Sequence, residues 1–343
     1  MLPSEAWRAP RLRVLANGAL LGNAEDATVL ASGGFTATFF RVRAALGTDA
    51  AFWAANAALA IDVQISLSPL GGFVSLVQGN ADAVGIDPIA GTLILEGRDY
   101  AAALIEARTN ETFANRTASE IATLLAGRHA LTPDVQATTT PVGRYWELEH
   151  DSLTLDSGAR MTTEWDLLAT LAGWEGFDLW VSGTTLHFRP PEAALPPPVL
   201  SAISLPGALP DFRALRLDRA LSFAGNIIVT VKSWHSRMGT GTVQTASNAR
   251  DGAATRNFVF VVPNLTPEAA QRLAQQRLAE LASHELLLRA EMPGELALSP
   301  HASFHLIGTG TLFDQVWQIE EVERRISVRH GFMQLVRARA SSG

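Results

Sequence analysis

The sequence has 343 residues, of which 47% are hydrophobic and 18% are charged, with a formal net charge of −7. This composition excludes a disordered chain, and the negative balance argues against a nucleic-acid-binding surface, which needs clustered Lys and Arg. The absence of cysteine excludes disulfide frameworks, thiolate zinc sites and cysteine nucleophiles.

Residues 1–97 are predicted to form a first β-rich domain. Two short apolar runs joined by Asn17-Gly18 carry a strong hairpin signal. In "IDVQISL", the apolar residues Ile61, Val63 and Ile65 alternate with polar ones, which predicts a strand with one buried face. Several short strands at this spacing indicate a sandwich or a barrel.

Residues 98–190 are predicted to form an α+β domain inserted after the first. Three helices are expected, each preceded by an N-capping residue: Asp99, Thr117 and Thr163. Glu120 would complete a capping box with Thr117, and Gly173 is the expected stop signal of the third helix. A hairpin around Ser182-Gly183 closes the segment.

The Pro-rich stretch 191–199 is predicted to be a linker, because proline fixes φ and lacks an N–H. Residues 200–343 then return to β character, with one predicted helix at 266–284. Thr266 is expected to cap this helix, and Pro267 suits its first turn. The fold class predicted from these patterns is mainly β with an α+β insert.

The acidic residues offer no convincing catalytic pair. Glu164 and Asp166 fall in the first turn of a predicted helix, where acids generally complement the helix dipole. In a regular strand, Glu321 and Glu323 would share a face with Ile319, which fits a solvated or interface strand better than a catalytic dyad.

The remaining motifs also favour structural roles. His301 and His305 lack a third ligand at a recognised spacing, so a metal site is not predicted. The Gly-rich runs "GTGTVQT" and "IGTGTLF" lack the helix and the lysine that a phosphate-binding loop requires. We therefore expect no catalytic, cofactor-binding or metal-binding residues, no cofactor, and no enzymatic activity.

The segment from Gly79 to Phe188 resembles the phage late control gene D proteins, the baseplate hub proteins of contractile and related tails, a family related to the N-terminal hub part of type VI secretion spike proteins. The resemblance is carried by an ordered set of short motifs: Gly97-Arg98-Asp99, then Phe113, Asn115 and Thr117, then Ser119-Glu120-Ile121-Ala122, and finally "WDLLATLAGWEGFDLWVSGTTLHF". The flanking β-rich parts agree with the family in order and length more than in residues.

This resemblance implies two related β-barrel-like tube domains flanking a small α+β (LysM-like) domain. It further implies a homotrimer that forms a ring and joins the tail tube, or a distal tail protein, to a central spike protein. The tape measure protein would lie inside, and DNA would pass through the lumen without specific binding. An acidic balance would suit such a channel, because a basic lining would retain DNA.

The expected location is therefore the tail of a phage, a tailocin or a gene transfer agent, assembled in the cytoplasm of the host bacterium. The sequence ends at Gly343, without the OB-fold and needle of secretion-system relatives, so we expect the spike to be a separate protein.

Two alternatives belong to other classes. The first is a tail protein that binds or hydrolyses the cell wall, with its site between Glu164 and Trp180. The second is a membrane-inserting β-barrel. The missing signal peptide and the predicted helix at Thr266 argue against the second, and no run reaches the ~20 apolar residues of a membrane helix, so no membrane insertion is expected.

Overall fold

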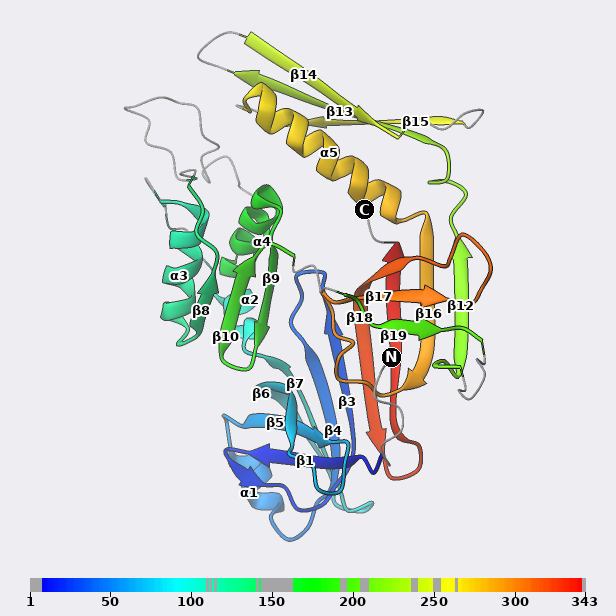
Figure 1. Ribbon diagram of the computed structural model, residues 1–343. Coiled ribbons are helices and arrows are strands. Elements are labelled where there is room, and N and C mark those ends of the chain that lie inside the picture. Colours follow the sequence, from blue (N-terminus) through cyan, green and yellow to red (C-terminus); the bar gives the residue numbers. More distant parts are fainter. Residues whose placement is uncertain are drawn as a thin grey trace.

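β-Strands are the predominant regular structure of the chain, as Figure 1 shows for the computed structural model, and along many of them buried and more exposed residues alternate. The structure describes residues 8–340, except 109–110, 112, 114–115, 140–141, 143–162, 192–195, 204–209, 236–239, 249–253 and 263–264. Asn115 and part of the Pro-rich stretch therefore lie outside the described residues. The mainly β fold predicted from the sequence is confirmed.

The first part of the chain contributes seven strands to a large sheet. They are β1 (Arg11–Ala16), β2 (Ala19–Leu20), β3 (Ala24–Ser32), β4 (Phe39–Ala45), β5 (Ala60–Ser66), β6 (Val74–Asp87) and β7 (Thr92–Asp99). Their order is β3-β4-β7-β6-β5-β1-β2, and the Cα atoms of β1 return to within 8 Å of β3, which gives this half a barrel-like curl. A short helix that the sequence analysis did not predict, α1 (Ala50–Ala55), buries Trp53.

Two sequence predictions in this half are confirmed. Ile61, Val63 and Ile65 of β5 are all buried. Asn17 and Gly18 both adopt positive φ, at 48° and 78°, between the paired strands β1 and β2. Positive φ at both central residues is the requirement of the favoured two-residue hairpin turn.

The last part of the chain extends the same sheet. Its strands are β11 (Val199–Ser201), β12 (Ala214–Arg219), β16 (Leu286–Pro293), β17 (Ser303–Ile307), β18 (Val316–Ser327) and β19 (Gly331–Ala340). β18 pairs with β3 from Glu321↔Ser32 to Ser327↔Asp26, so the two ends of the chain share one 13-stranded sheet. The core of the first half accordingly includes Ile326 and Phe332.

The predicted alternation of side chains in β18 is wrong. The pairing of β18 with β19 shifts register between Ile319 and Glu321, which marks a β-bulge or irregularity. An extra residue in one strand returns the following side chains to the opposite face. Ile319 and Val322 are consequently both buried, while Glu321 and Glu323 point to the other face, away from Ile319.

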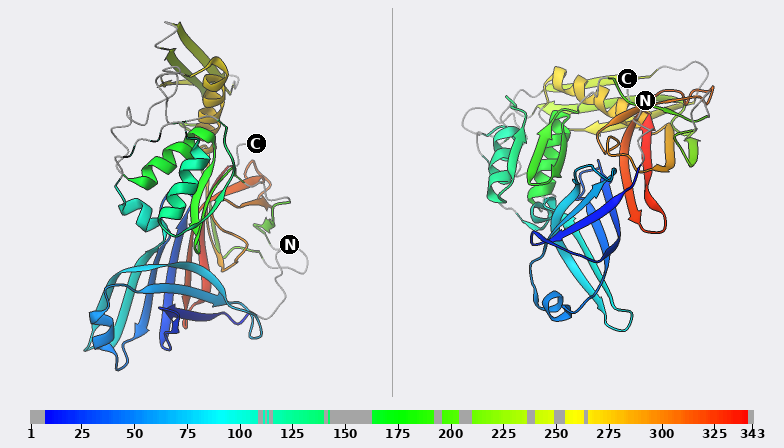
Figure 2. Two further views of the ribbon diagram at one scale, coloured as in Figure 1. Left: turned by 90° about the vertical axis from the view of Figure 1, so that its left-hand side faces the viewer. Right: turned by 60° about the horizontal axis from the view of Figure 1, so that its bottom comes forward.

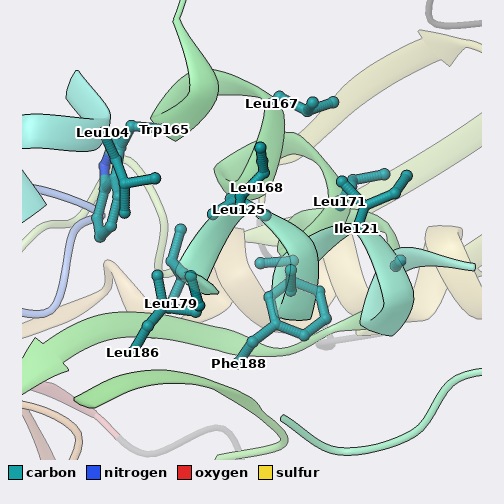
Figure 3. Close-up of a cluster of buried hydrophobic side chains, with 14 of the residues drawn as sticks. Leu104, Ile121, Leu125, Trp165, Leu167, Leu168, Leu171, Leu179, Leu186 and Phe188 are labelled. Carbon is teal, nitrogen blue, oxygen red and sulfur yellow. The ribbon is translucent and has the colours of Figure 1, made fainter. Parts of the chain in front are cut away.

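Between the two halves lies a compact α+β unit, Ala101 to Arg189, called the insert below. It consists of α2 (Ala101–Glu106), α3 (Ala118–Arg128), β8 (Thr132–Val135), α4 (Glu164–Glu175), β9 (Asp178–Ser182) and β10 (Thr185–Arg189). Its helices cover one face of the small sheet β8-β10-β9, and leucines of α3 and α4 meet Leu186 and Phe188 of β10 in a separate core (Figure 3).

The helix caps of the insert mostly follow the sequence predictions. Thr117 and Glu120 form the complete capping box, and the Thr163 side chain accepts the N–H of Asp166. The predicted stop at Gly173 is wrong: α4 continues to Glu175 and ends at Gly176, whose φ of 71° is the left-handed conformation typical of helix ends. The hairpin after Ser182, with Gly183 at φ 55°, is confirmed.

A further small layer follows β12. β13 (Asn226–His235), β14 (Thr240–Ser247) and β15 (Thr255–Val261) form a three-stranded sheet in the order β14-β13-β15, and α5 (Pro267–Ser283) covers one of its faces. Thr266 caps α5 and Pro267 stands in its first turn, as predicted. In Figures 1 and 2 this layer, called the β13–α5 layer, lies at the end of the molecule opposite α1.

Gly97 provides a test of the close packing inside the sheet. A Cβ at this position would lie 2.1 Å from the Asn80 carbonyl oxygen and 2.6 Å from Cζ of Phe40. We expect Gly97→Ala to lower the free energy of unfolding by about 2 kcal/mol or more, as other overpacking changes do. Urea denaturation followed by circular dichroism measures the effect.

The matched control is Gly127→Ala in α3, where no atom lies within 4 Å of the added Cβ. Alanine is the better helix former by about 1 kcal/mol, so this variant should be more stable than the wild type. Equal stability of the two variants would contradict the close packing at Gly97.

Candidate interaction sites

The Gly97-Arg98-Asp99 motif joins the sheet to the insert. The Arg98 guanidinium forms ion pairs with Asp82 of β6 and Glu106 of α2. The prediction that Asp99 is the N-cap residue of α2 is wrong, because Tyr100 occupies that position. The Asp99 carboxylate nevertheless accepts the backbone N–H of Ala101 at 3.0 Å and that of Thr38 at 2.8 Å. The motif therefore serves as a structural joint.

Burial raises the pKa of Asp99 to about 6, although the N–H groups of Thr38 and Ala101 oppose the shift by favouring the carboxylate. A carboxyl group whose pKa is higher in the folded than in the unfolded state binds more protons when folded between these two pKa values. Its contribution to stability is therefore greatest below pH 4, falls between about pH 4 and 6, and levels off above.

We expect this pH dependence of stability to appear when the wild type is compared with Asp99→Asn. The free energy of unfolding of the wild type, relative to the variant, should fall by about 2 kcal/mol as the pH rises from about 4 to 6. Chemical denaturation across this pH range measures the difference. A difference that does not vary with pH would show that Asp99 has an ordinary pKa.

Glu164 has a role that the sequence analysis missed. Glu164 was expected only to complement the dipole of α4 from its first turn, but its side chain is 3% exposed. Its carboxylate contacts the Arg128 guanidinium and lies 2.6 Å from Nε2 of His129, both at the end of α3. Arg128 and His129, at the C-terminal end of α3, thus connect α3 to the first turn of α4. No sequence spacing could reveal this contact, because 36 residues separate Arg128 from Glu164.

Removing this buried carboxylate is expected to loosen the insert. Glu164→Gln should lower the free energy of unfolding by about 2 kcal/mol, since it removes a buried negative charge that contacts both Arg128 and His129. The matched control is Glu111→Gln, which removes the exposed partner of the same arginine and should cost less than about 1 kcal/mol. Equal effects in thermal denaturation would contradict a special role for Glu164.

The other candidate residues do not converge on a reaction centre. Arg337 and Arg325 form ion pairs with Glu321 and Glu323 on the face of β18 opposite Val322. His301 pairs with Asp178 of the insert, and no group of three potential metal ligands occurs among the described residues. The run "IGTGTLF" is a turn in which the Thr309 hydroxyl and the backbone N–H groups of Thr309 and Gly310 donate hydrogen bonds to Asp314, and these bonds lower the pKa of its carboxyl group.

Three stacked rings join the insert to the second half of the sheet. Trp180 of β9 lies between His187 of β10, at 4.5 Å between ring centroids, and His301, at 4.7 Å. Each imidazole also contacts a carboxylate: His187 contacts Asp134 and His301 contacts Asp178. The insert is therefore held at both ends, by Asp99 near α2 and by this stack at β9.

The outer face of the β13–α5 layer is an exposed apolar surface. α5 covers one face of its sheet, where Ile227, Val229 and Val231 are buried. On the other face the large apolar side chains are between 55% and 75% exposed: Trp234, Val243, Val259 and Val261. Val243 and Val261 flank the exposed Lys232 in the register of the sheet, so the apolar residues surround one positive charge. Patches of this kind mark interaction surfaces.

Comparison with solved structures shows which known proteins share this fold. A tail protein from Neisseria meningitidis MC58 aligns over 96% of both chains with a TM-score of 0.73 and 16% identity. The fold is that of phage tail proteins. The 43 kDa tail protein of prophage MuSo2 from Shewanella oneidensis aligns over 97% of this chain and 99% of its own, with a TM-score of 0.69 and 14% identity.

A component of the E. coli type VI secretion system with structural similarity to the T4 tail proteins gp27 and gp5 also shares the fold, with a TM-score of 0.58 and 10% identity. It covers 97% of this chain and 76% of the E. coli chain. No protein-family model and no curated protein sequence matches this tail-protein-like chain. Within the described residues, no helix combines the length and the apolar character that a membrane crossing requires.

Proposed function

We propose that this protein is a structural hub of a phage or phage-derived tail. The observation that carries the proposal is the end-to-end agreement of its fold with tail proteins, over 96% of both chains in the case of the Neisseria protein. The absence of a convergent catalytic or metal site among the described residues is compatible with a non-enzymatic role.

In this proposal three copies form a ring between the tail tube, or a distal tail protein, and a central spike protein. Tape measure protein and DNA would occupy the lumen. The proposed domain division is the one predicted from the sequence: tube domains at 1–97 and 200–343, an α+β domain at 98–190 and a linker at 191–199. Pairing of β3 with β18 places the two β-rich parts side by side in one sheet, as adjacent segments of a ring wall would be.

The exposed face of the β13–α5 layer supplies a subunit contact in this ring. A row of valines and a tryptophan on an uncovered sheet face is costly to hydrate, and burying it against a second copy would remove that cost. A heterologous contact between identical chains forms a closed ring when each contact rotates the next copy by a whole fraction of a turn, and one third of a turn gives a trimer.

The ring predicts a definite mass. Three copies of 36.7 kDa give about 110 kDa, and light scattering of the purified protein should report that value, with rings in negative-stain images of the same peak. A monomer that stays monomeric when mixed with tube and spike proteins would overturn the trimeric hub.

Two variants locate the contact. The double substitution V243D/V261D, which places acids on the exposed face, should shift the trimer toward monomer without changing the circular dichroism spectrum. The matched control is Ile89→Asp, which changes a side chain that is 99% exposed in the turn between β6 and β7. A trimer that survives the double substitution would place the contact elsewhere.

A further inference from the structure

A cavity of about 410 Å³ lies where the insert meets both halves of the sheet. Its wall includes Thr38 and Asp99 from the first half, Ser182 from the insert, and His301 and Arg324 from the second half. Several hundred cubic ångströms is the size range of small-molecule sites, and such sites occur preferentially where structural units meet.

The wall contains a buried cation that forms no ion pair with a carboxylate of the described residues. Arg324 is only 7% exposed, and its Nη2 donates a hydrogen bond to the Leu298 carbonyl at 2.6 Å. Its Nε is buried and has no hydrogen-bond partner among the described residues. Burial lowers the pKa of Arg324 to about 10, partly offset by the negative charge of Glu295, so the guanidinium is still charged at neutral pH.

The nearest acid does not neutralise this charge by direct contact. The Glu295 carboxylate already binds the Arg8 guanidinium at 2.6 Å and accepts the N–H of Leu296 at 3.0 Å. A buried charge is unfavourable unless it is paired and hydrogen-bonded. An anion that entered the cavity and contacted Arg324 would therefore stabilise the arrangement.

His301 is a second, independent indication that the cavity is a binding site. It adopts a φ of 71°, which is unusual for a residue with a side chain, and such outliers are concentrated at functional sites. Its Nδ1 lies 3.0 Å from Asp178, while its Nε2 is buried with no partner among the described residues. The wall thus holds a buried guanidinium and an imidazole whose orientation is fixed by Asp178.

We propose that this cavity binds a carboxylate group, with Arg324 as its main contact. A guanidinium matches a carboxylate because it can offer two parallel N–H groups. A singly charged group fits better than a phosphate dianion, since one arginine must balance it while Asp99 adds negative charge to the same wall. The carboxylate comes either from a small free acid or from an acidic side chain of a partner protein.

This proposal does not depend on the tail function, because it rests only on the cavity and its buried charge. Two probes test it by thermal denaturation at constant ionic strength, with sodium chloride as the reference: sodium acetate, and N-acetyl-glutamate amide as a peptide-like acid. We expect a saturable rise of the Tm with at least one probe, since a ligand that binds only the folded state stabilises it.

Arg324→Gln should weaken the binding about tenfold or more, as expected when a charge-assisted hydrogen bond is lost. The matched control is Arg325→Gln, the next residue of β18, whose side chain is 67% exposed and pairs with Glu323; it should leave the binding unchanged. If Arg324→Gln does not fold, Ser182→Phe narrows the cavity from the insert and should also abolish the saturable effect.

The possible results of these measurements either support the proposal or overturn it. Stronger binding of acetate assigns a small free acid, and stronger binding of the peptide-like probe assigns a partner's acidic side chain. A rise that does not saturate, or that is equal in the wild type and the variants, means an adventitious ion only and overturns the proposal.

Discussion

The pairing of β3 with β18 is the interaction on which the rest of the fold depends. Seven consecutive residue pairs, from Ser32↔Glu321 to Asp26↔Ser327, connect the beginning of the chain to its end. Without them the large sheet would divide into two sheets with unprotected edges, which favour aggregation. The same pairing brings Ile326 and Phe332 into the core of the first half, so the first β-rich part does not complete its core alone, whereas the core of the second part is built from its own residues.

The position of the insert depends on the sheet formed by this pairing. It has a core of its own, yet its position is set by contacts at its two ends: the Asp99 carboxylate at the start of α2 and the His187-Trp180-His301 stack at β9. One of these contacts reaches the first half of the sheet and the other reaches the second. The orientation of the insert therefore depends on contacts with both halves of the sheet.

Local signals in the sequence predicted local structure well. The capping residues Thr117, Thr163 and Thr266 were identified because a cap is defined by residues three or four positions apart. The errors came from effects that no short window contains. The bulge at Glu320 depends on the partner strand, and the end of α4 at Gly176 rather than Gly173 depends on packing.

The same difference between local signals and long-range contacts applies to the candidate sites. The burial of Glu164 between Arg128 and His129 and the isolation of Arg324 in a cavity wall both depend on contacts between residues far apart in the sequence. Neither position is marked by a motif. The resemblance to tail hub proteins, in contrast, was visible in the order of several short motifs, and the fold agrees with it.

The β13–α5 layer has one further property. Its core, built around Ile227, Val229 and Val231, is separate from the cores of the sheet and of the insert. Parts of a protein with separate cores open at their own free-energy cost. Amide hydrogens of β13 would accordingly exchange with solvent independently of those of β18, and burial of the layer's outer face by another chain would slow that exchange without any change in the central sheet.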